Sequence, residues 1–294
     1  MLKRIITAIV ALGVFIPIVI FSHTWVSAAL IGVCIVIAVF ESIRCIGQKK
    51  NFFLTIPLCT ASMVMPLYTI YATQYAKSTD PQSVFTVGAV VTILVTLYVF
   101  TVAVFSSKTL NVADAGLLIA MFIFANAGFT SLIYIRNVAT NGKYLVYLPF
   151  IVAWVTDSFA YFTGRFLGKH KLIPAVSPKK TIEGAIGGTI GGAICVILFA
   201  LVISTFFKPD GGEGVIKANY FAFAIFGLFI PIFGQIGDLM MSVIKRNYGI
   251  KDYGKFFPGH GGMLDRFDSA LANCMILAIV CTCPYFDLLP TIVS

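Results

Sequence analysis

The sequence predicts an all-α polytopic integral membrane protein of about nine transmembrane helices, and two observations carry that prediction. Hydrophobic residues make up 59% of the 294 residues and charged residues 11%, with a mean hydropathy of +0.96. Soluble domains are about 45–50% apolar and about 25% charged, and disorder requires low hydrophobicity with high net charge. Segments without Asp, Glu, Lys or Arg also recur, each near the ~20 residues that a helix needs to cross a bilayer.

The uncharged segments define the spans in order along the chain. Residues 5–40 are too many for one span, and a polar Ser-His-Thr stretch at 22–24 interrupts them, so they predict a helical hairpin. Lys3 and Arg4 precede a long apolar run with another span directly behind it, which favours an uncleaved first helix over a signal peptide. Further spans are expected at about 52–72, 84–105, 115–135, 144–164, 184–207, 219–241 and 268–286. We group them as 1–80 (helices 1–3), 81–165 (helices 4–6) and 166–294 (helices 7–9 with cytoplasmic catalytic loops).

The basic residues predict the orientation of these spans. With the N-terminus in the cytoplasm, 16 of the 21 Lys and Arg residues fall in inside segments and 5 in outside segments. The positive-inside rule therefore predicts an N-in, C-out protein with nine spans. The net charge of +9 indicates these loops and a phosphate-bearing ligand rather than nucleic acid, because no soluble domain is predicted. The seven cysteines form no CxxC and are expected to be small buried hydrophobes.

An acid inside the sixth predicted span is the first candidate for a functional residue. Trp154, Asp157, Tyr161 and Gly164 recur at spacings that place them on one helix face. An acid within a span is costly and usually faces a cavity or a partner. Asp157 is therefore either part of a binding site or half of a structural ion pair with a neighbouring helix.

The second region surrounds a Ser-Pro pair. Ser177 and Pro178 predict a helix start, with Ser177 as N-cap and Pro178 at the first helical position. Lys179 and Lys180 would then lie in the first turn, where the helix dipole disfavours cations. A bound phosphate would remove that conflict. Alternatively, the two lysines mark the cytoplasmic face and attract anionic lipid.

The same predicted helix carries glycines in a regular pattern. Gly184, Gly188 and Gly192 recur every fourth residue, and Gly187 and Gly191 form a second pair with the same spacing. Small residues let helix backbones approach closely in lipid. We therefore interpret this stripe as a helix-packing surface.

The third region, 235–268, has the densest set of polar residues. Gln235, Asp238, Ser242 and Lys245 form a polar stripe on an apolar helix. Beyond it, acids, lysines, arginines, glycines and His260 alternate. Carboxylates can hold a hard cation, bases can neutralise phosphate oxygens, and glycines let backbone N–H groups approach an anion. The segment predicts a metal and polyphosphate site, and it is not a P-loop because no GxxxxGK[ST] is present.

This segment resembles the signature of the phosphatidate cytidylyltransferase (CDP-diacylglycerol synthase) family. The matching residues are Ser242, Lys245, Arg246, Lys251, Asp252, Gly254, Pro258, His260, Gly261, Gly262, Asp265, Arg266 and Asp268. The stretch from Ser177 to Gly184 also resembles that family's Ser-Pro-Lys-Lys-Thr-x-Glu-Gly box. The resemblance implies cytidylyl transfer from CTP to phosphatidic acid for phospholipid biosynthesis, with CDP-diacylglycerol and pyrophosphate as products. It also implies dependence on Mg²⁺, a second monovalent cation in the site, and a homodimer. The active site is expected to be embedded in the membrane, a bacterial inner membrane, and to face the cytoplasm.

The resemblance assigns roles to individual residues. Metal binding falls to Asp238 and Asp265, together with Asp268. The candidate catalytic residues are Lys245, Arg246, Lys251, Asp252, His260 and Arg266. The candidate substrate-binding residues are Ser177, Lys179, Lys180, Thr181, Glu183, Ser242, Gly261, Gly262 and Asp157.

Two other functions stay open at this point. One is a CTP-dependent cytidylyltransferase or kinase that acts on another membrane lipid, either an ether lipid or a polyprenol. The other is an anion transporter, which predicts polar residues near mid-membrane in both halves of the chain. Here the polar residues gather in the C-terminal half, which favours an enzyme.

Overall fold

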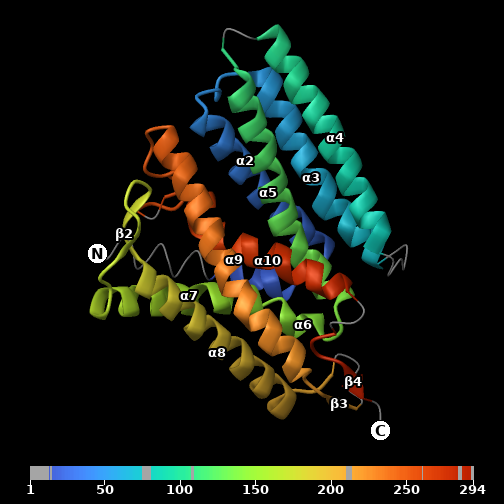
Figure 1. Ribbon diagram of the computed structural model, residues 1–294. Helices are drawn as coiled ribbons and strands as arrows, with labels where there is room; N and C mark the ends of the chain where they lie inside the picture. Colours follow the sequence, from blue (N-terminus) through green and yellow to red (C-terminus); the bar gives the residue numbers. More distant parts are fainter. Residues whose placement is uncertain are drawn as a thin grey trace. The chain divides into compact units, whose positions relative to one another are not determined.

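The computed structural model describes residues 13, 15–74, 81–106, 109–209, 214–259, 261–283 and 287–292. Helices dominate these residues, and four short strands pair as two small antiparallel sheets (Figure 1). The helices are α2 (Trp25–Cys45), α3 (Phe52–Gln74), α4 (Pro81–Phe105), α5 (Val112–Val138), α6 (Gly142–Leu145), α7 (Leu148–Phe166), α8 (Ile182–Phe206), α9 (Tyr220–Asn247) and α10 (Leu264–Thr282). The strands are β1 (Lys171–Ile173), β2 (Ser177–Thr181), β3 (Val215–Ile216) and β4 (Thr291–Ile292).

The polytopic helical membrane class is confirmed. Within the described ranges, seven helical segments are long and apolar enough to cross a bilayer. They run over 25–45, 52–74, 82–105, 112–138, 142–166, 182–206 and 220–247, and they match the second to eighth predicted spans. The first predicted span falls largely on residues outside the described ones, and the ninth corresponds to α10, which is not among the seven. The total of nine and the N-in orientation stay predictions.

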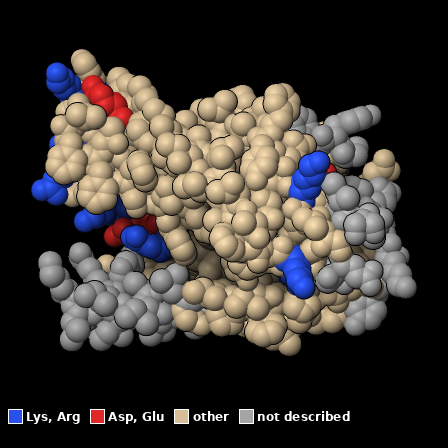
Figure 2. Space-filling model, turned by 90° about the horizontal axis from the view of Figure 1, so that it is seen from below, with Lys and Arg blue, Asp and Glu red and all other residues tan. Residues whose placement is uncertain are grey.

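The surface agrees with a lipid environment. Large apolar side chains on the spanning helices are exposed, among them Phe53, Phe105 and Phe206. Figure 2 shows a face on which charged side chains are few and broad uncharged areas lie between them. Exposed apolar area of this extent indicates a membrane or protein interface.

The chain divides into two compact units. Unit 1 contains residues up to Tyr134 together with Lys245–Phe267, and unit 2 contains Ile135–Ile244 together with Asp268 onward. Both α9 and α10 contribute residues to each unit. The sequence signature is consequently shared between the two units.

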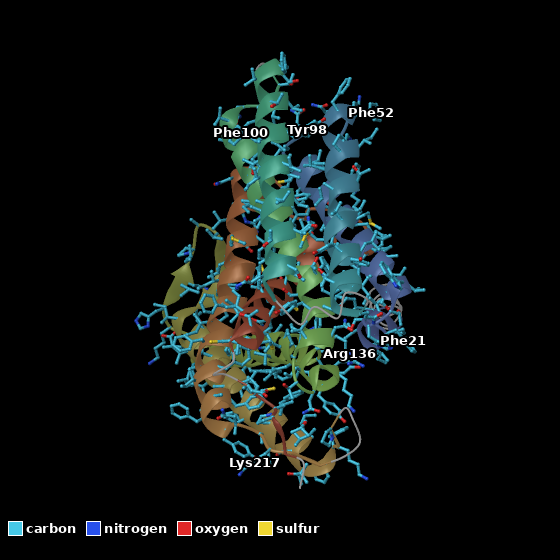
Figure 3. All side chains as sticks on the ribbon, turned by 90° about the vertical axis from the view of Figure 1, so that its right-hand side faces the viewer. Phe21, Phe52, Tyr98, Phe100, Arg136 and Lys217 are labelled. Atoms are coloured by element: carbon cyan, nitrogen blue, oxygen red, sulfur yellow. The ribbon has the colours of Figure 1, made fainter. Side chains whose placement is uncertain are left out.

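Unit 1 contains α2, α3, α4 and most of α5, with α3 packed on both α2 and α4. Phe52, at the start of α3, lies at the same end of the unit as Tyr98 and Phe100 of α4, and Phe21 lies at the opposite end (Figure 3). The Tyr98 hydroxyl donates a hydrogen bond to the carbonyl of Phe53. Helices α3 and α4 are therefore antiparallel neighbours.

Unit 2 is organised by the packing of α7 on α8, and the predicted glycine surface is confirmed there. A Cβ added at Gly188 would lie 2.9 Å from the Thr156 carbonyl oxygen and 3.0 Å from the Ala160 Cβ. A Cβ at Gly184 would lie 2.7 Å from the Ala160 carbonyl oxygen. The glycine stripe thus lets α8 approach the α7 backbone directly.

The predicted helix start at Ser177 is wrong. Ser177 and Pro178 lie in β2, where Ser177 pairs with Ile173 and Thr181 with Lys171. Thr181 is the N-cap of α8, because its extended backbone places Oγ1 to accept the Gly184 N–H at 3.1 Å. Strand pairing between β1 and β2 keeps residues 177–181 extended, so α8 begins only after Thr181. Lys179 and Lys180 accordingly lie in a strand, outside the first turn of α8.

Candidate active site

Three predicted site residues from different elements of unit 2 form one cluster. We call Asp157 of α7, Lys180 of β2 and Asp238 of α9 the Lys180 cluster. The Lys180 ammonium donates to Asp238 Oδ2, with side-chain exposures of 32% and 26%. Asp157 lies within electrostatic reach of both partners. The cluster therefore joins two carboxylates and one cation at a partly accessible position.

Neighbouring polar residues hold α9 and β2 in place around this cluster. Gln235, almost one turn before Asp238, donates to the Ala185 carbonyl at 3.3 Å and to Thr189 Oγ1 at 3.1 Å. These bonds attach the polar stripe of α9 to α8. They orient the Asp238 face of α9 toward the β2–α8 junction.

The β2–α8 junction is fixed by a second set of polar contacts. The backbone N–H of His170 donates to Glu183 Oε1 at 3.2 Å, and His170 Nδ1 lies 2.6 Å from the same oxygen. With Thr181 as the α8 N-cap, Glu183 shapes the junction that presents Lys180. Ser177 is half-buried within β2, whereas Lys179 is exposed.

In unit 1, residues 248–263 form a loop between α9 and α10, and Asp265, in the first turn of α10, is the centre of its contacts. Its Oδ1 accepts from Lys245 Nζ at 2.8 Å, and its Oδ2 accepts from the backbone N–H groups of Tyr253 at 2.8 Å and Gly262 at 2.9 Å. The side chains of Asp265 and Lys245 are 2% and 12% exposed. One buried carboxylate thus connects the end of α9, the following loop and the first turn of α10.

The same loop makes a tight turn before α10. Gly261 has φ +95°, a conformation that L side chains rarely adopt, and its carbonyl accepts the Phe257 N–H at 2.9 Å. Lys251, Asp252 and Arg266 are exposed around this turn. The turn therefore leaves charged side chains accessible on a fixed backbone. His260, a predicted catalytic residue, lies outside the described residues.

The remaining predicted residues lie on α9 and α10. Ser242 is half-buried and Arg246 exposed on the last turns of α9. Asp268 is buried in α10 within unit 2, and its Oδ1 accepts the Ser269 N–H at 2.8 Å. Asp268 therefore lies on a buried face of α10.

The chemistry of the carboxylates indicates where a divalent cation fits. Among the residues that the structure describes, no group of three or more His, Cys, Asp or Glu side chains is arranged to hold a metal. Mg²⁺ needs only one or two carboxylates when substrate phosphates and water complete its shell. Asp157 and Asp238 supply such a set, whereas three donors already occupy Asp265. The Lys180 cluster consequently fits a Mg²⁺–phosphate ligand, and the assignments of Asp238, Asp265 and Asp268 to the metal stay predictions.

Two features near the loop were not predicted from the sequence. Glu41 of α2 accepts hydrogen bonds from the backbone of the loop, and the Tyr248 hydroxyl donates to Asp114 of α5. Burial and the Asp114 hydrogen bond raise the pKa of Tyr248 to about 12. The available signal was Glu41 itself, which is an acid directly after a long uncharged segment.

The sequence of the chain is similar to those of known proteins. Residues 2–284 match the model of a family described as the Cytidylyltransferase family. The chain is 33% identical over 271 residues to a phosphatidate cytidylyltransferase of Bacillus subtilis (strain 168), covering 92% of this chain and 94% of the relative. It is 30% identical over 279 residues to a phosphatidate cytidylyltransferase of Staphylococcus haemolyticus (strain JCSC1435), covering 94% and 97%. A protein of the same name from Staphylococcus aureus (strain COL) is 29% identical over 288 residues, again covering 94% and 97%.

Proposed function

The chain belongs to the cytidylyltransferase family, and we propose that it transfers the cytidylyl group of CTP to phosphatidic acid, forming CDP-diacylglycerol and pyrophosphate. The structural observation that carries this proposal is the Lys180 cluster, where two acids and a lysine from three elements meet. In a reaction between two polyanions, the lysine can neutralise phosphate oxygens directly, and the carboxylates can hold a Mg²⁺ ion that neutralises more of the charge. The choice of phosphatidic acid over an ether lipid or a polyprenol rests on the names of the relatives.

The proposed reaction is an in-line displacement at phosphorus. A phosphate oxygen of phosphatidic acid forms a bond to the α-phosphorus of CTP, and the bond from that phosphorus to the bridging oxygen breaks. The electron pair of the broken bond leaves with pyrophosphate. A phosphate dianion is already a competent nucleophile, so no strong general base is needed. Charge neutralisation and positioning are therefore the main demands on the protein.

The basic residues meet those demands in this proposal. Lys180 neutralises phosphate oxygens at the Lys180 cluster, and Lys251 and Arg266 do the same on the loop in unit 1. Lys245 has a different part, because its ammonium is bound to Asp265 and holds the loop. Asp157 and Asp238 would hold Mg²⁺, which when bound neutralises charge on the triphosphate.

The setting in the bilayer completes the proposal. The spanning helices make the chain an integral membrane protein, which suits a substrate that never leaves the lipid phase. The excess of basic residues in the inside segments favours a site that faces the cytoplasm of a bacterial inner membrane, where CTP is present. The homodimer and the second, monovalent cation implied by the family resemblance belong to the same proposal.

Purified protein in detergent tests this function. We expect pyrophosphate release that requires CTP, phosphatidic acid and Mg²⁺ together, with CDP-diacylglycerol formed in equal amount. Parallel reactions contain a polyprenyl phosphate, an ether-linked phosphatidate analogue or no lipid. Faster turnover of either alternative lipid would reassign the substrate. Absence of pyrophosphate release with every lipid would contradict cytidylyl transfer.

A further inference from the structure

A buried carboxylate from α2 is bound to the loop of unit 1. Glu41 lies near the C-terminal end of α2 and is 4% exposed. Burial of a charged carboxylate is costly unless hydrogen bonds compensate. The hydrogen bonds that Glu41 accepts therefore indicate its role.

Those contacts come from the start of α10. Glu41 Oε1 accepts the Met263 N–H at 2.9 Å, and Oε2 accepts the Leu264 N–H at 3.0 Å. The first N–H groups of a helix have no partner within the helix, and its N-terminus favours negative charge. Glu41 thus caps α10 from 222 residues away, with one oxygen for each N–H group.

Two glycines of the loop lie against the same carboxylate. A Cβ added at Gly254 would lie 2.7 Å from Glu41 Cδ, and one at Gly262 would lie 2.5 Å from it. Neither glycine has a positive φ, so backbone conformation does not explain them. The space that Glu41 occupies does explain them, because any side chain at either position would overlap its carboxylate.

Asp265 holds the opposite part of the loop. Its Oδ2 accepts the N–H groups of Tyr253, which precedes Gly254, and of Gly262, one of the two glycines that contact Glu41. Together the two carboxylates fix this segment at its two ends, through the N–H group of Tyr253 and those of Gly262, Met263 and Leu264. The exposed Lys251 and Arg266 lie just outside this fixed segment.

We infer that Glu41 is a positioning residue of the cytidylyl-transfer site. Its carboxylate holds the loop and the first turn of α10 so that Lys251 and Arg266 meet the phosphates in a fixed arrangement. This inference rests on the proposed function, since the arrangement matters only if the loop binds phosphates. It also gives the N-terminal helices a part in the reaction, because α2 supplies the anchor.

The first experiment measures amide hydrogen exchange at the start of α10 in the absence of substrate. Glu41→Gln keeps the shape but replaces one acceptor oxygen by an NH₂ donor, so one of the two N–H groups loses its partner. We expect hydrogen exchange at the amides of Met263 and Leu264 to accelerate at least ~10-fold. The matched control is Ser42→Ala, which removes a buried hydroxyl that donates only to the Ala38 carbonyl of its own helix at 2.9 Å. Unchanged exchange in Glu41→Gln would overturn the inference.

The second experiment measures turnover per folded molecule. We expect Glu41→Gln to lower kcat by ~10²-fold, the scale of a small misplacement of reacting groups, with a Tm within a few degrees of that of Ser42→Ala. A merely structural role would lower the yield of folded protein and leave its kcat unchanged. Parental kcat beside accelerated exchange would also overturn the inference. If the parent itself does not turn over phosphatidic acid, the proposed function fails, whereas the exchange result still reports on the anchor.

The third experiment tests the explanation of the glycines. Gly254→Ala is expected to lower kcat strongly in the parent and to cost at most about twofold in the Glu41→Ala background, where the overlapping carboxylate is gone. Glu41→Asp serves as a second background, because its shorter side chain also makes room and keeps the charge. Equal losses from Gly254→Ala in the parent and in these backgrounds would contradict a steric role of Glu41.

Discussion

Asp238→Asn is the substitution that separates the chemistry of the Lys180 cluster from its contribution to stability. Asparagine keeps the size of the side chain and one oxygen that accepts a hydrogen bond from Lys180. It removes the negative charge that, in the proposed function, would bind Mg²⁺ and so help to arrange the phosphates. Folding and turnover should therefore respond very differently.

The exposure of the pair sets the expected change in stability, and its place in the proposed active site sets the expected change in kcat. Lys180 and Asp238 are 32% and 26% exposed, so water screens their attraction, and such pairs contribute ~0.2–1 kcal/mol to stability. Loss of one preorganised electrostatic contact in an active site costs ~10²–10³ in kcat, or ~2.7–4 kcal/mol. We expect a kcat reduced by that factor, with a Tm lowered by only a few degrees.

The assay is pyrophosphate release from CTP and phosphatidic acid over a Mg²⁺ titration, with Tm measured in the same detergent. The matched control is Asp287→Asn, an acid beside Leu288, whose carbonyl accepts the Asn219 N–H immediately before α9 at 3.1 Å. Asp238 lies about 28 Å further along that helix. Near-parental kcat and unchanged Mg²⁺ dependence in Asp238→Asn would remove this residue from the site, and an equal loss in Asp287→Asn would show a non-specific effect.

Three further predictions follow from contacts in the two units. Lys180→Ala should lower kcat by at least ~10² through loss of a cation from the cluster, and parental kinetics would show that this lysine only marks topology. Gly188→Ala should lower Tm, because the new Cβ lies 2.9 Å from a carbonyl oxygen, whereas Gly116→Ala, which meets nothing within 4 Å, should not; equal shifts would contradict the packing argument. Tyr248→Phe should cost ~1.5–3 kcal/mol at neutral pH through the lost hydrogen bond to Asp114. The pKa of Tyr248 is about 12 in the folded protein against an ordinary 10.0, so the stability that its protonated hydroxyl contributes is complete below pH 10 and is lost as the pH rises toward 12. The difference in Tm between the parent and Tyr248→Phe should therefore be largest below pH 10 and become smaller toward pH 12. A difference that does not change with pH would contradict this linkage.

The spans could be predicted because few structures satisfy a long uncharged segment in lipid. The helices from α2 to α9 that are long and apolar enough to cross a bilayer follow these segments. The small sheets could not be predicted in the same way. A strand such as β2 exists because β1 supplies its hydrogen bonds, and no pattern within residues 177–181 encodes that partner.

The candidate site shows the same limit. The polar stripe made Asp238 a candidate site residue and the family signature did the same for Asp265, and the glycine spacing of α8 predicted its packing surface. A contact with an element that is distant in the sequence is different, because it leaves no pattern in the residues around either partner. Glu41 acts on residues 222 positions away, so its partner became visible only in three dimensions.

Transfer of a labelled phosphate shows which part of CTP moves to the lipid. Purified protein is incubated with phosphatidic acid, Mg²⁺ and CTP that is labelled either at the α-phosphate or at the γ-phosphate. Cytidylyl transfer predicts that the α-label enters the lipid product and the γ-label leaves as pyrophosphate. Entry of the γ-label into lipid, with CDP as the released product, would identify a lipid kinase and contradict cytidylyl transfer.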